Sequence, residues 1–178
     1  MNEANRILAG TEKSAFVSQM YKQYYAKIFK YTLYRVGDRN TAEDLVSEVF
    51  EKVWIKYYTF NPQKAKFSTW LFTIANNTII DYLKKNNRQG ETVCLEKVAA
   101  KYRLEDVIIH QELKEYLLKA ISCLDERQKN IISLKFAACL TNREIARMLD
   151  LTESNVGTIL YRSLKQLRDI LKEQEIIC

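Results

Sequence analysis

The spacing of apolar residues along the chain predicts a protein built from helices. Apolar side chains recur every three or four positions, which places them on one face of an α-helix. The chain has one Pro and four Gly in 178 residues, so helix breakers are scarce. We therefore predict an all-α fold. The expected helices cover residues 14–36 (one long helix or a broken pair), 41–56, 66–85, 112–123, 125–138, 142–149 and 153–174.

The periodicity weakens between residues 86 and 111, where the sequence also contains a Gly. This stretch is typical of a linker with some helical character. It divides the chain into two small helical domains. The predicted domains are residues 1–90 and 112–178, joined by a linker over 91–111.

Side chains that can cap helices stand at several predicted starts. Thr41 opens T-A-E-D, which resembles a capping box, and Thr141 with Glu144 forms the box T-N-R-E. Asp125 and Thr152 are good N-cap residues for the helices that follow them. These signals favour a C-terminal pair of helices over 142–149 and 153–174.

The two helices of this pair have the spacing of a helix-turn-helix. Ile145, Ala146 and Leu149 supply the inner face of the first. In the second, apolar residues share one arc, which is Val156, Leu160, Leu164, Leu167 and Leu171, bordered by Ile159 and Ile170. The opposite face carries small polar groups, then an aromatic and two cations, as a DNA-reading helix does. Its candidates are Ser154, Asn155, Thr158, Tyr161, Arg162 and Lys165. An ordinary helical hairpin with a solvated face is the alternative.

Gly157 lies inside this second helix, where a Gly costs roughly 1 kcal/mol against Ala. Close approach to the preceding helix or to a DNA backbone would explain it.

The helix over 66–85 has two different faces. One is apolar and is assigned to the core, namely Phe67, Leu71, Phe72, Ala75, Ile79, Tyr82 and Leu83. The other face carries hydroxyl, amide and basic groups, with Trp70 at its edge, either in the core or on this polar face. This second face can hold single-stranded nucleic acid. The candidates are Trp70, Thr73, Asn76, Asn77, Lys84 and Arg88, with Lys64 and Lys66 in the preceding loop.

The helix over 41–56 carries a polar face opposite its apolar one. Its exposed candidates are Asp44, Ser47, Glu48, Glu51 and Lys52, while Phe50 and Trp54 are expected to pack beneath it. A solvated charged face is the alternative without further information.

Charge and composition narrow the function classes. The net charge is +6; residues 1–90 hold 14 basic and 8 acidic residues, and residues 91–178 hold 14 of each. A basic excess is compatible with a polyanion partner. No apolar run is long enough to span a bilayer, and the N-terminus lacks a signal pattern, so we expect a cytoplasmic protein.

Candidate chemistry is sparse. The four Cys, at 94, 123, 139 and 178, form no C-x-x-C pair, and the only His is His110, so we expect free thiols and no structural zinc. We find no Ser-His-Asp set, no paired carboxylates in a pocket pattern and no phosphate-binding glycine loop. We therefore predict no enzymatic activity, no metal and no cofactor.

Three segments together resemble the sigma factors of bacterial RNA polymerase, in particular the extracytoplasmic-function (ECF) group. AEDLVSEVFEKVW is similar to the polymerase-binding helix of that family and FSTWLFTIANNTIIDYLKKNNR to its −10 reading helix. LDERQKNIISLKF, followed by LTNREIARMLDLTESNVGTILYRSLKQL, is similar to its −35 reading domain. The segments occur in the family's order and span nearly the whole chain.

The resemblance implies a role for each face. The polar face at 44–52 would bind core RNA polymerase, the face at 64–88 would read and open the −10 element, and the face at 154–165 would read the −35 element as duplex. The partners implied are core RNA polymerase, promoter DNA and an anti-sigma factor. The chain departs from the family pattern at Ser47, where Gln is common, at Asp125, where Pro is common, at Ala138-Cys139, where Gly is common, and at Leu160-Tyr161, where some relatives have arginines.

Two other functions are weighed against this one. A stand-alone helix-turn-helix regulator would use residues 1–90 for sensing or dimerisation, and a helical adaptor would bind no DNA. Residues 41–88 separate these hypotheses, because a repressor needs no acidic docking helix followed by a helix of Trp, Asn and Lys.

Overall fold

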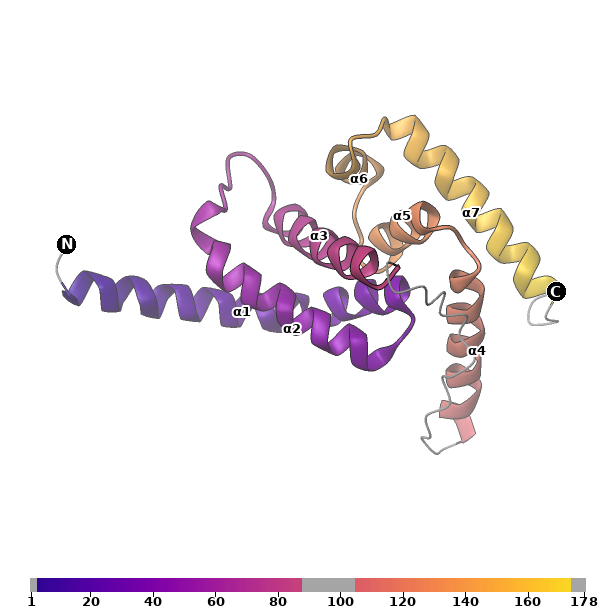
Figure 1. The fold of residues 1–178 in the computed structure, drawn as a ribbon, viewed down its shortest axis with the longest axis horizontal. Coiled ribbons are helices and arrows are strands. Elements are labelled where there is room, and N and C mark those ends of the chain that lie inside the picture. The colour runs from indigo at the N-terminus through magenta and orange to yellow at the C-terminus, as the bar shows by residue number, and fades with distance from the viewer. Residues whose placement is uncertain (1–2, 88–104, 174–178) are drawn as a thin grey trace.

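The computed structural model describes residues 3–87 and 105–173, and every regular element in those ranges is a helix (Figure 1). The predicted all-α fold is confirmed. The α-helices are α1 (Glu3–Val36), α2 (Arg39–Lys56), α3 (Phe67–Asn87), α4 (Glu105–Ser122), α5 (Glu126–Phe136), α6 (Asn142–Leu149) and α7 (Glu153–Glu173), with a short 3₁₀ helix at Tyr57–Thr59. None of the described helices is long and apolar enough to cross a bilayer.

Two helices differ in extent from the sequence prediction. α1 is a single helix that begins at Glu3, so the broken pair is not observed. α4 begins at Glu105, inside the predicted 91–111 linker. The rest of that linker, with the expected boundary near residue 90, lies outside the described residues.

The start of α2 is set by Asp38, and the predicted capping role of Thr41 is wrong. Gly37 adopts a left-handed φ of 76°, which ends α1 and turns the chain. The Thr41 N–H then donates to Asp38 Oδ2 at 2.7 Å, so Asp38 is the N-cap. This hydrogen bond from the backbone holds the pKa of Asp38 below its ordinary value.

Helices α1, α2 and α3 pack together around the apolar faces that the sequence predicts. Leu71, Phe72, Ala75 and Ile79 of α3 are buried, and Phe67, Tyr82 and Leu83 are partly buried against the same core. Phe50 is buried beneath α2 as expected. Trp54 is not: its side chain is 42% exposed and the Lys13 ammonium lies 4.4 Å from its ring centroid.

Helices α4 to α7 form the second half. The capping boxes predicted for Thr141 and the cap predicted for Asp125 are both present. Val156, Leu160 and Leu167 are buried as predicted, but Leu164 is 45% exposed and Ser163 is fully buried in its place. The Ser163 hydroxyl donates to the Ile159 carbonyl at 2.8 Å, which satisfies it inside its own helix.

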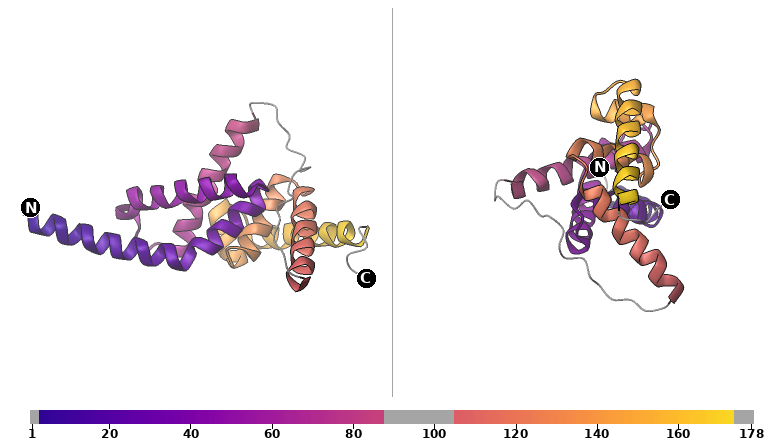
Figure 2. Two further views of the ribbon diagram at one scale, coloured as in Figure 1. Left: turned by 90° about the horizontal axis from the view of Figure 1, so that it is seen from below. Right: turned by 90° about the vertical axis from the view of Figure 1, so that its right-hand side faces the viewer.

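The two halves touch. α1 packs against α5 and α4, and α3 packs against α6. Figures 1 and 2 show α5 lying beside α3, with α7 on the far side of α5 and α6. This arrangement positions the outer face of α7 in solvent and covers part of α3.

Candidate nucleic-acid interface

The outward face of α7 is assembled by the turn that precedes it. α6 ends at Asp150, which adopts a left-handed φ of 54°, and the Leu151 N–H donates back to the Ala146 carbonyl at 2.8 Å. The Asn155 N–H then donates to Thr152 Oγ1 at 3.1 Å, the N-cap bond expected from the sequence. This geometry fixes the angle between the two helices of the predicted helix-turn-helix.

All six candidates on α7 are exposed, including the Tyr161 ring at 72%. Hydroxyl and amide groups stand at the N-terminal end and cations follow, on one side of the helix. An exposed row of this kind fits the major groove of duplex DNA, with Asn155 in reach of base edges and Arg162 in reach of phosphates. The row is Ser154, Asn155, Thr158, Tyr161, Arg162 and Lys165.

Gly157 has no packing reason in the free protein. A Cβ added there would meet nothing closer than Asn142 Nδ2, at 4.0 Å, which is ordinary contact. The expected close approach to the preceding helix is therefore absent. The structure leaves the second expectation, a close approach by a DNA backbone, untested.

The candidates on and before α3 do not share one environment. Asn77 and Lys84 are exposed, as are Lys64 and Lys66 in the preceding loop, whereas Thr73 is half-buried. Arg88 lies outside the described residues. The predicted face is thus open to solvent at Lys64, Lys66, Asn77 and Lys84 and partly covered at Thr73.

Trp70 is half-buried and belongs to an aromatic cluster. Its ring centroid lies 5.5 Å from that of Phe60 and 5.4 Å from that of Phe67. Phe60 follows the 3₁₀ helix, so these contacts attach the 57–66 loop to the start of α3. Trp70 therefore supports the loop and keeps one edge at the surface.

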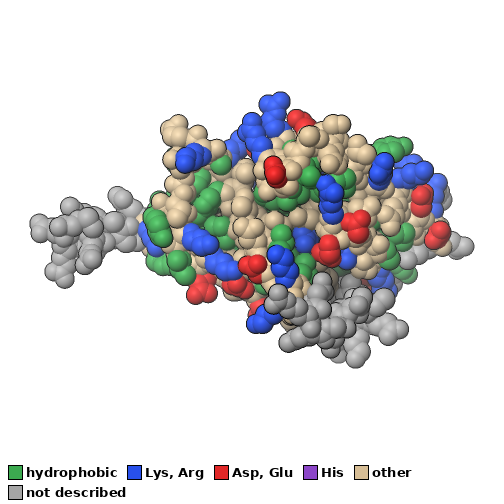
Figure 3. All heavy atoms as spheres, turned by 45° about the horizontal axis from the view of Figure 1, so that its top comes forward, with side chains coloured by type: hydrophobic (Ala, Val, Ile, Leu, Met, Phe, Trp, Pro, Cys, Tyr) green, Lys and Arg blue, Asp and Glu red, His purple; other side chains and the backbone are tan. Residues whose placement is uncertain are grey.

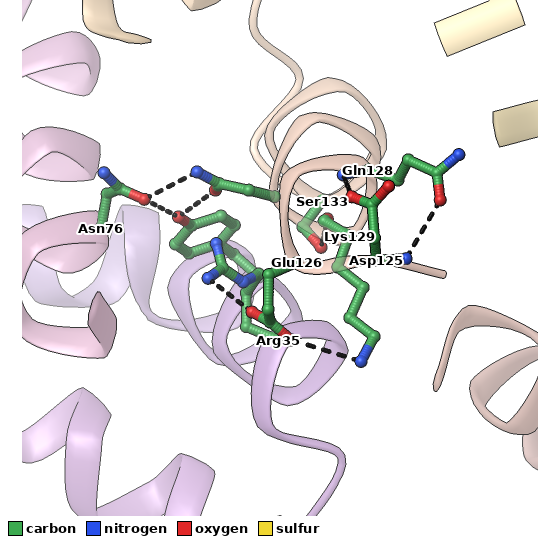
Figure 4. A network of polar contacts seen from close by, with 9 residues as sticks. Arg35, Asn76, Asp125, Glu126, Gln128, Lys129 and Ser133 are labelled. Carbon is green, nitrogen blue, oxygen red and sulfur yellow. Dashed lines mark hydrogen bonds and ion pairs between the residues drawn. The ribbon is translucent and has the colours of Figure 1, made fainter. Parts of the chain in front are cut away.

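Asn76 is buried at the junction between the two halves (Figure 4). Its Oδ1 accepts from Asn130 Nδ2 at 2.9 Å and lies 3.1 Å from the Tyr31 hydroxyl, which is also 2.9 Å from Asn130 Oδ1. Complete burial raises the pKa of Tyr31, so the hydroxyl stays protonated and can donate. In this conformation α5 covers the Asn76 amide that the sequence places on a DNA-reading face.

Arg35 lies beside this network with few partners. Its side chain is 3% exposed and Nη2 donates to Glu126 Oε2 at 3.1 Å, while Glu126 Oε1 also receives Lys129 Nζ at 3.3 Å. Among the described atoms, Arg35 Nε and Nη1 find no hydrogen-bond partner. A buried guanidinium with two unpartnered nitrogens is costly.

The polar face of α2 is exposed as expected. Asp44, Ser47, Glu48 and Glu51 all reach solvent. Lys52 is half-buried, pairing with Glu48 Oε1 at 2.6 Å and donating to Thr78 Oγ1 of α3 at 3.1 Å. The face therefore presents mainly negative charge, because Lys52 is bound to Glu48 and Thr78.

The remaining surface of the described residues carries charges of both signs. In the view of Figure 3, Lys and Arg side chains are spread over the surface with Asp and Glu between them. The described residues contain no group of three side chains able to hold a metal ion. Cys123 and Cys139 are free and exposed.

Comparison with known proteins decides the family. The family model for Sigma-70 region 2 matches residues 20–89, and that for Sigma-70 region 4 matches residues 114–167. The chain is 32% identical over 176 residues to the ECF RNA polymerase sigma factor BldN of Streptomyces coelicolor. The chain belongs to the ECF sigma factors. The expected resemblance is confirmed.

The share of each relative's length that this sigma factor covers differs from one relative to another. The match with BldN takes in 97% of this chain and 66% of BldN. The ECF sigma factor SigM of Bacillus subtilis is 24% identical, with 85% of this chain and 93% of SigM covered. A solved complex of the sigma factor RpoE with the anti-sigma factor NepR, from Bartonella quintana, has a TM-score of 0.71 at 23% identity over 87% of this chain and 96% of that one. This likeness supports the fold.

Sequence reasoning missed the junction of the sigma factor. The sequence pattern predicts no polar contact for Tyr31, Arg35 or Asn130, yet their side chains meet Asn76 and Glu126 there. Asn130 offered one signal, since an amide among the apolar residues of QKNIISLKF must find a partner if buried. Which residue that partner is depends on long-range packing.

Proposed function

We propose that this sigma factor binds core RNA polymerase through α2, reads the −35 element with α7 and opens the −10 element with α3. One observation carries the proposal. An exposed acidic helix, an amide-bearing helix and a helix-turn-helix with a fully exposed outer face follow one another in the order of the two sigma regions. A stand-alone regulator has no use for the first two and is not favoured.

The polymerase-binding face is supported by exposure and charge. Asp44, Glu48 and Glu51 offer carboxylates within two turns of α2, suited to Arg or Lys side chains of a partner. Lys52 fixes Glu48 in place and ties α2 to α3. The Ser47 hydroxyl donates to the Glu43 carbonyl at 3.0 Å. Its proton is therefore already used within α2, and Ser47 would contribute packing contact with the polymerase more than a strong hydrogen bond to it.

Reading of the −35 duplex rests on the α7 row. Asn155 can pair with both N6 and N7 of an adenine in the major groove, while Ser154, Thr158 and Tyr161 reach neighbouring base edges or sugars. Arg162 and Lys165, one turn further along, lie where phosphates pass. Base contacts at the start of α7 give specificity, and the later cations give affinity.

Opening of the −10 element rests on α3 and its preceding loop. A base taken out of the stack costs a few kcal/mol, which stacking and hydrogen bonds to the base must offset. Asn77 is the exposed amide for such bonds, with Thr73 and the edge of Trp70 beside it. Basic groups around them hold phosphates, namely Lys64, Lys66, Lys84 and Arg88. Asn76 joins this set only when α5 moves away.

The chain recognises the promoter and opens its strands, and the core enzyme synthesises the RNA. The protein therefore acts without catalytic residues, metal or cofactor of its own, in the cytoplasm where promoter DNA lies. An anti-sigma factor is a further proposed partner, since the solved relative RpoE is held by NepR. Affinity purification from native cells that yields polymerase subunits and no second small protein would contradict this partner.

Run-off transcription with purified core polymerase tests the function. We expect a promoter-dependent transcript with the wild-type chain and none without it. Glu48→Lys reverses one docking charge and is expected to lower the yield at least tenfold, whereas Glu173→Lys, an equally exposed acidic position at the end of α7, is expected to leave it unchanged. Tight duplex binding by the chain alone with no transcript at any concentration would refute the proposal.

A further inference from the structure

The junction between the two halves contains a network of polar side chains beside its apolar contacts. Tyr31, Asn76 and Asn130 exchange hydrogen bonds there, and Arg35 pairs with Glu126 beside them (Figure 4). Two side-chain hydrogen bonds of Asn130 run across the junction, to Tyr31 and Asn76. Polar contacts of this kind are typical of surfaces that separate, because water can replace each bond.

The same junction engages two residues of the proposed −10 face. Asn76 is 5% exposed under α5. Lys66 pairs with Glu144 of α6 at 3.0 Å, although its side chain is 77% exposed. DNA bound to α3 and α5 bound to α3 therefore compete for Asn76.

We propose that Tyr31, Asn76 and Asn130, together with the Arg35–Glu126 pair, form a latch that holds the sigma factor closed and keeps Asn76 of its −10 face covered. Opening separates α5 from α1 and α3, frees the Asn76 amide and lets α3 and α7 move apart to read two DNA elements at once. The gating part rests on the proposed function. The latch itself is a property of the free chain.

The latch is built to be marginal. Within residues 3–87 and 105–173, Arg35 Nε and Nη1 have no hydrogen-bond partner, so the closed state keeps a poorly compensated charge that water would solvate on opening. The acceptor of Nη2, Glu126, has a half-exposed side chain and is shared with Lys129. A closed state with this defect can be displaced by a competing partner.

Two substitutions loosen the latch without touching the proposed DNA or polymerase contacts. Asn130→Ala removes the amide that bridges to Tyr31 and Asn76. Glu126→Lys removes the acceptor of Arg35 and places a cation beside it. Arg127→Gln is the matched control, because Arg127 is exposed on the same helix.

A distance measurement on the full-length free chain tests the latch. The four native Cys are replaced by Ser, and nitroxide labels are placed at the exposed positions Lys22 on α1 and Arg168 on α7 for pulsed electron paramagnetic resonance. We expect a dominant short-distance population and a minor long-distance one in the parent chain and in Arg127→Gln. Glu126→Lys is expected to lower the closed-to-open ratio roughly tenfold, the size of a lost hydrogen bond to a charged group, and Asn130→Ala roughly fivefold.

Identical distance distributions in the parent, Glu126→Lys and Asn130→Ala would overturn the latch, as would a parent that is already as open as the variants. Circular dichroism confirms that each variant keeps its helices. If Asn130→Ala loses them, Glu126→Lys alone decides, because its side chain lies half in solvent and its loss opens no cavity.

Titration of each chain into core polymerase and a promoter tests the gating. A closed population reduces apparent affinity by the open fraction, so both loosened variants are expected to reach half-maximal run-off transcription at a several-fold lower concentration. Unchanged half-saturation with altered distances would overturn gating. No transcript from any chain, with distances altered as expected, would refute the proposed function and leave the latch standing.

Discussion

α3 and α7 are both helices of 21 residues that carry candidate DNA contacts, but they sit differently in the molecule. α7 packs along one side, against α4, α5 and α6, and leaves its opposite side in solvent. α3 packs against α1 and α2 on one side and against α6 on another, and α5 covers its residue Asn76.

The difference follows from what each helix would read. Duplex is a rigid object with a groove, and a helix with a permanently exposed row can enter it. A strand opened from a duplex appears only during initiation, so a face that reads it has no ligand beforehand. The covered amide on α3 and the free row on α7 are consistent with this order of events.

Loss of a cation from α7 is expected to give the largest effect. Arg162→Ala removes a charge-assisted phosphate contact, about 1.5–3 kcal/mol, and should weaken holoenzyme binding at every promoter alike. The slope of log affinity against log salt should shrink by about one. Filter binding over a range of KCl measures both, with Lys172→Ala, exposed near the end of α7, as control. Weaker binding at only one promoter sequence would indicate that Arg162 contacts a base and not a phosphate.

Substitution of two neighbouring Asn residues on α3 should change the stability of the protein by very different amounts. Asn76→Ala leaves the Tyr31 hydroxyl and the Asn130 amide short of a partner, which is expected to destabilise the closed chain by about 1–3 kcal/mol. Asn77→Ala touches an exposed side chain and should change stability by less than about 0.5 kcal/mol. Urea unfolding of the two variants checks this. Equal losses would mean that Asn76 is not buried in solution.

The capping box at the start of α6 stabilises the helix against which α7 packs. The Glu144 N–H donates to Thr141 Oγ1, and the Thr141 N–H donates back to Glu144 Oε2 at 2.9 Å. Thr141→Ala should therefore cost about 1 kcal/mol of unfolding free energy. Lower promoter affinity should accompany it. Unchanged unfolding would show that packing alone fixes α6.

The same box makes stability depend on pH. The Thr141 N–H holds the pKa of Glu144 below its ordinary value of 4.5, aided by Lys66. The folded state thus gains stability from ionised Glu144 above about pH 4.5, and loses it as pH falls through the lowered pKa. Glu144→Gln keeps the cap but does not titrate, so its unfolding free energy should fall less steeply below pH 4.5. Parallel curves for the two proteins would contradict this role.

The smallest expected effect is on stability at Gly157. Gly157→Ala meets no clash and should stabilise α7 by up to roughly 1 kcal/mol. If the position is reserved for close approach of DNA, affinity for the promoter falls while the melting temperature rises. A gain in both would show that DNA keeps its distance from Gly157.

Most of the fold follows from local sequence. Apolar periodicity located every described α-helix, and Asp125, Thr141 and Thr152 capped the helices assigned to them. The misses have local causes as well: Asp38 competes successfully with Thr41 for the start of α2, because Gly37 lets the chain turn just before it.

The candidate faces were predictable to different degrees. Helical projection places all six α7 candidates in solvent, because that helix has one packed side. Helical projection places both Asn76 and Asn77 on the polar face, and only the packing of α5 makes one buried and the other exposed. Leu164 is exposed and its neighbour Ser163 is buried for the same reason, since adjacent positions near the edge of an arc depend on the neighbouring helix.

Strand opening at a single promoter tests the division of labour most directly. A fluorescent 2-aminopurine in the −10 element reports unstacking by the holoenzyme, and filter binding reports occupancy in the same samples. We expect Arg162→Ala to lower occupancy and leave the opened fraction of bound complexes unchanged, whereas Asn77→Ala should keep occupancy and lower the opened fraction at least severalfold. An Asn77→Ala holoenzyme that opens the element as fully as the parent would contradict this division of labour.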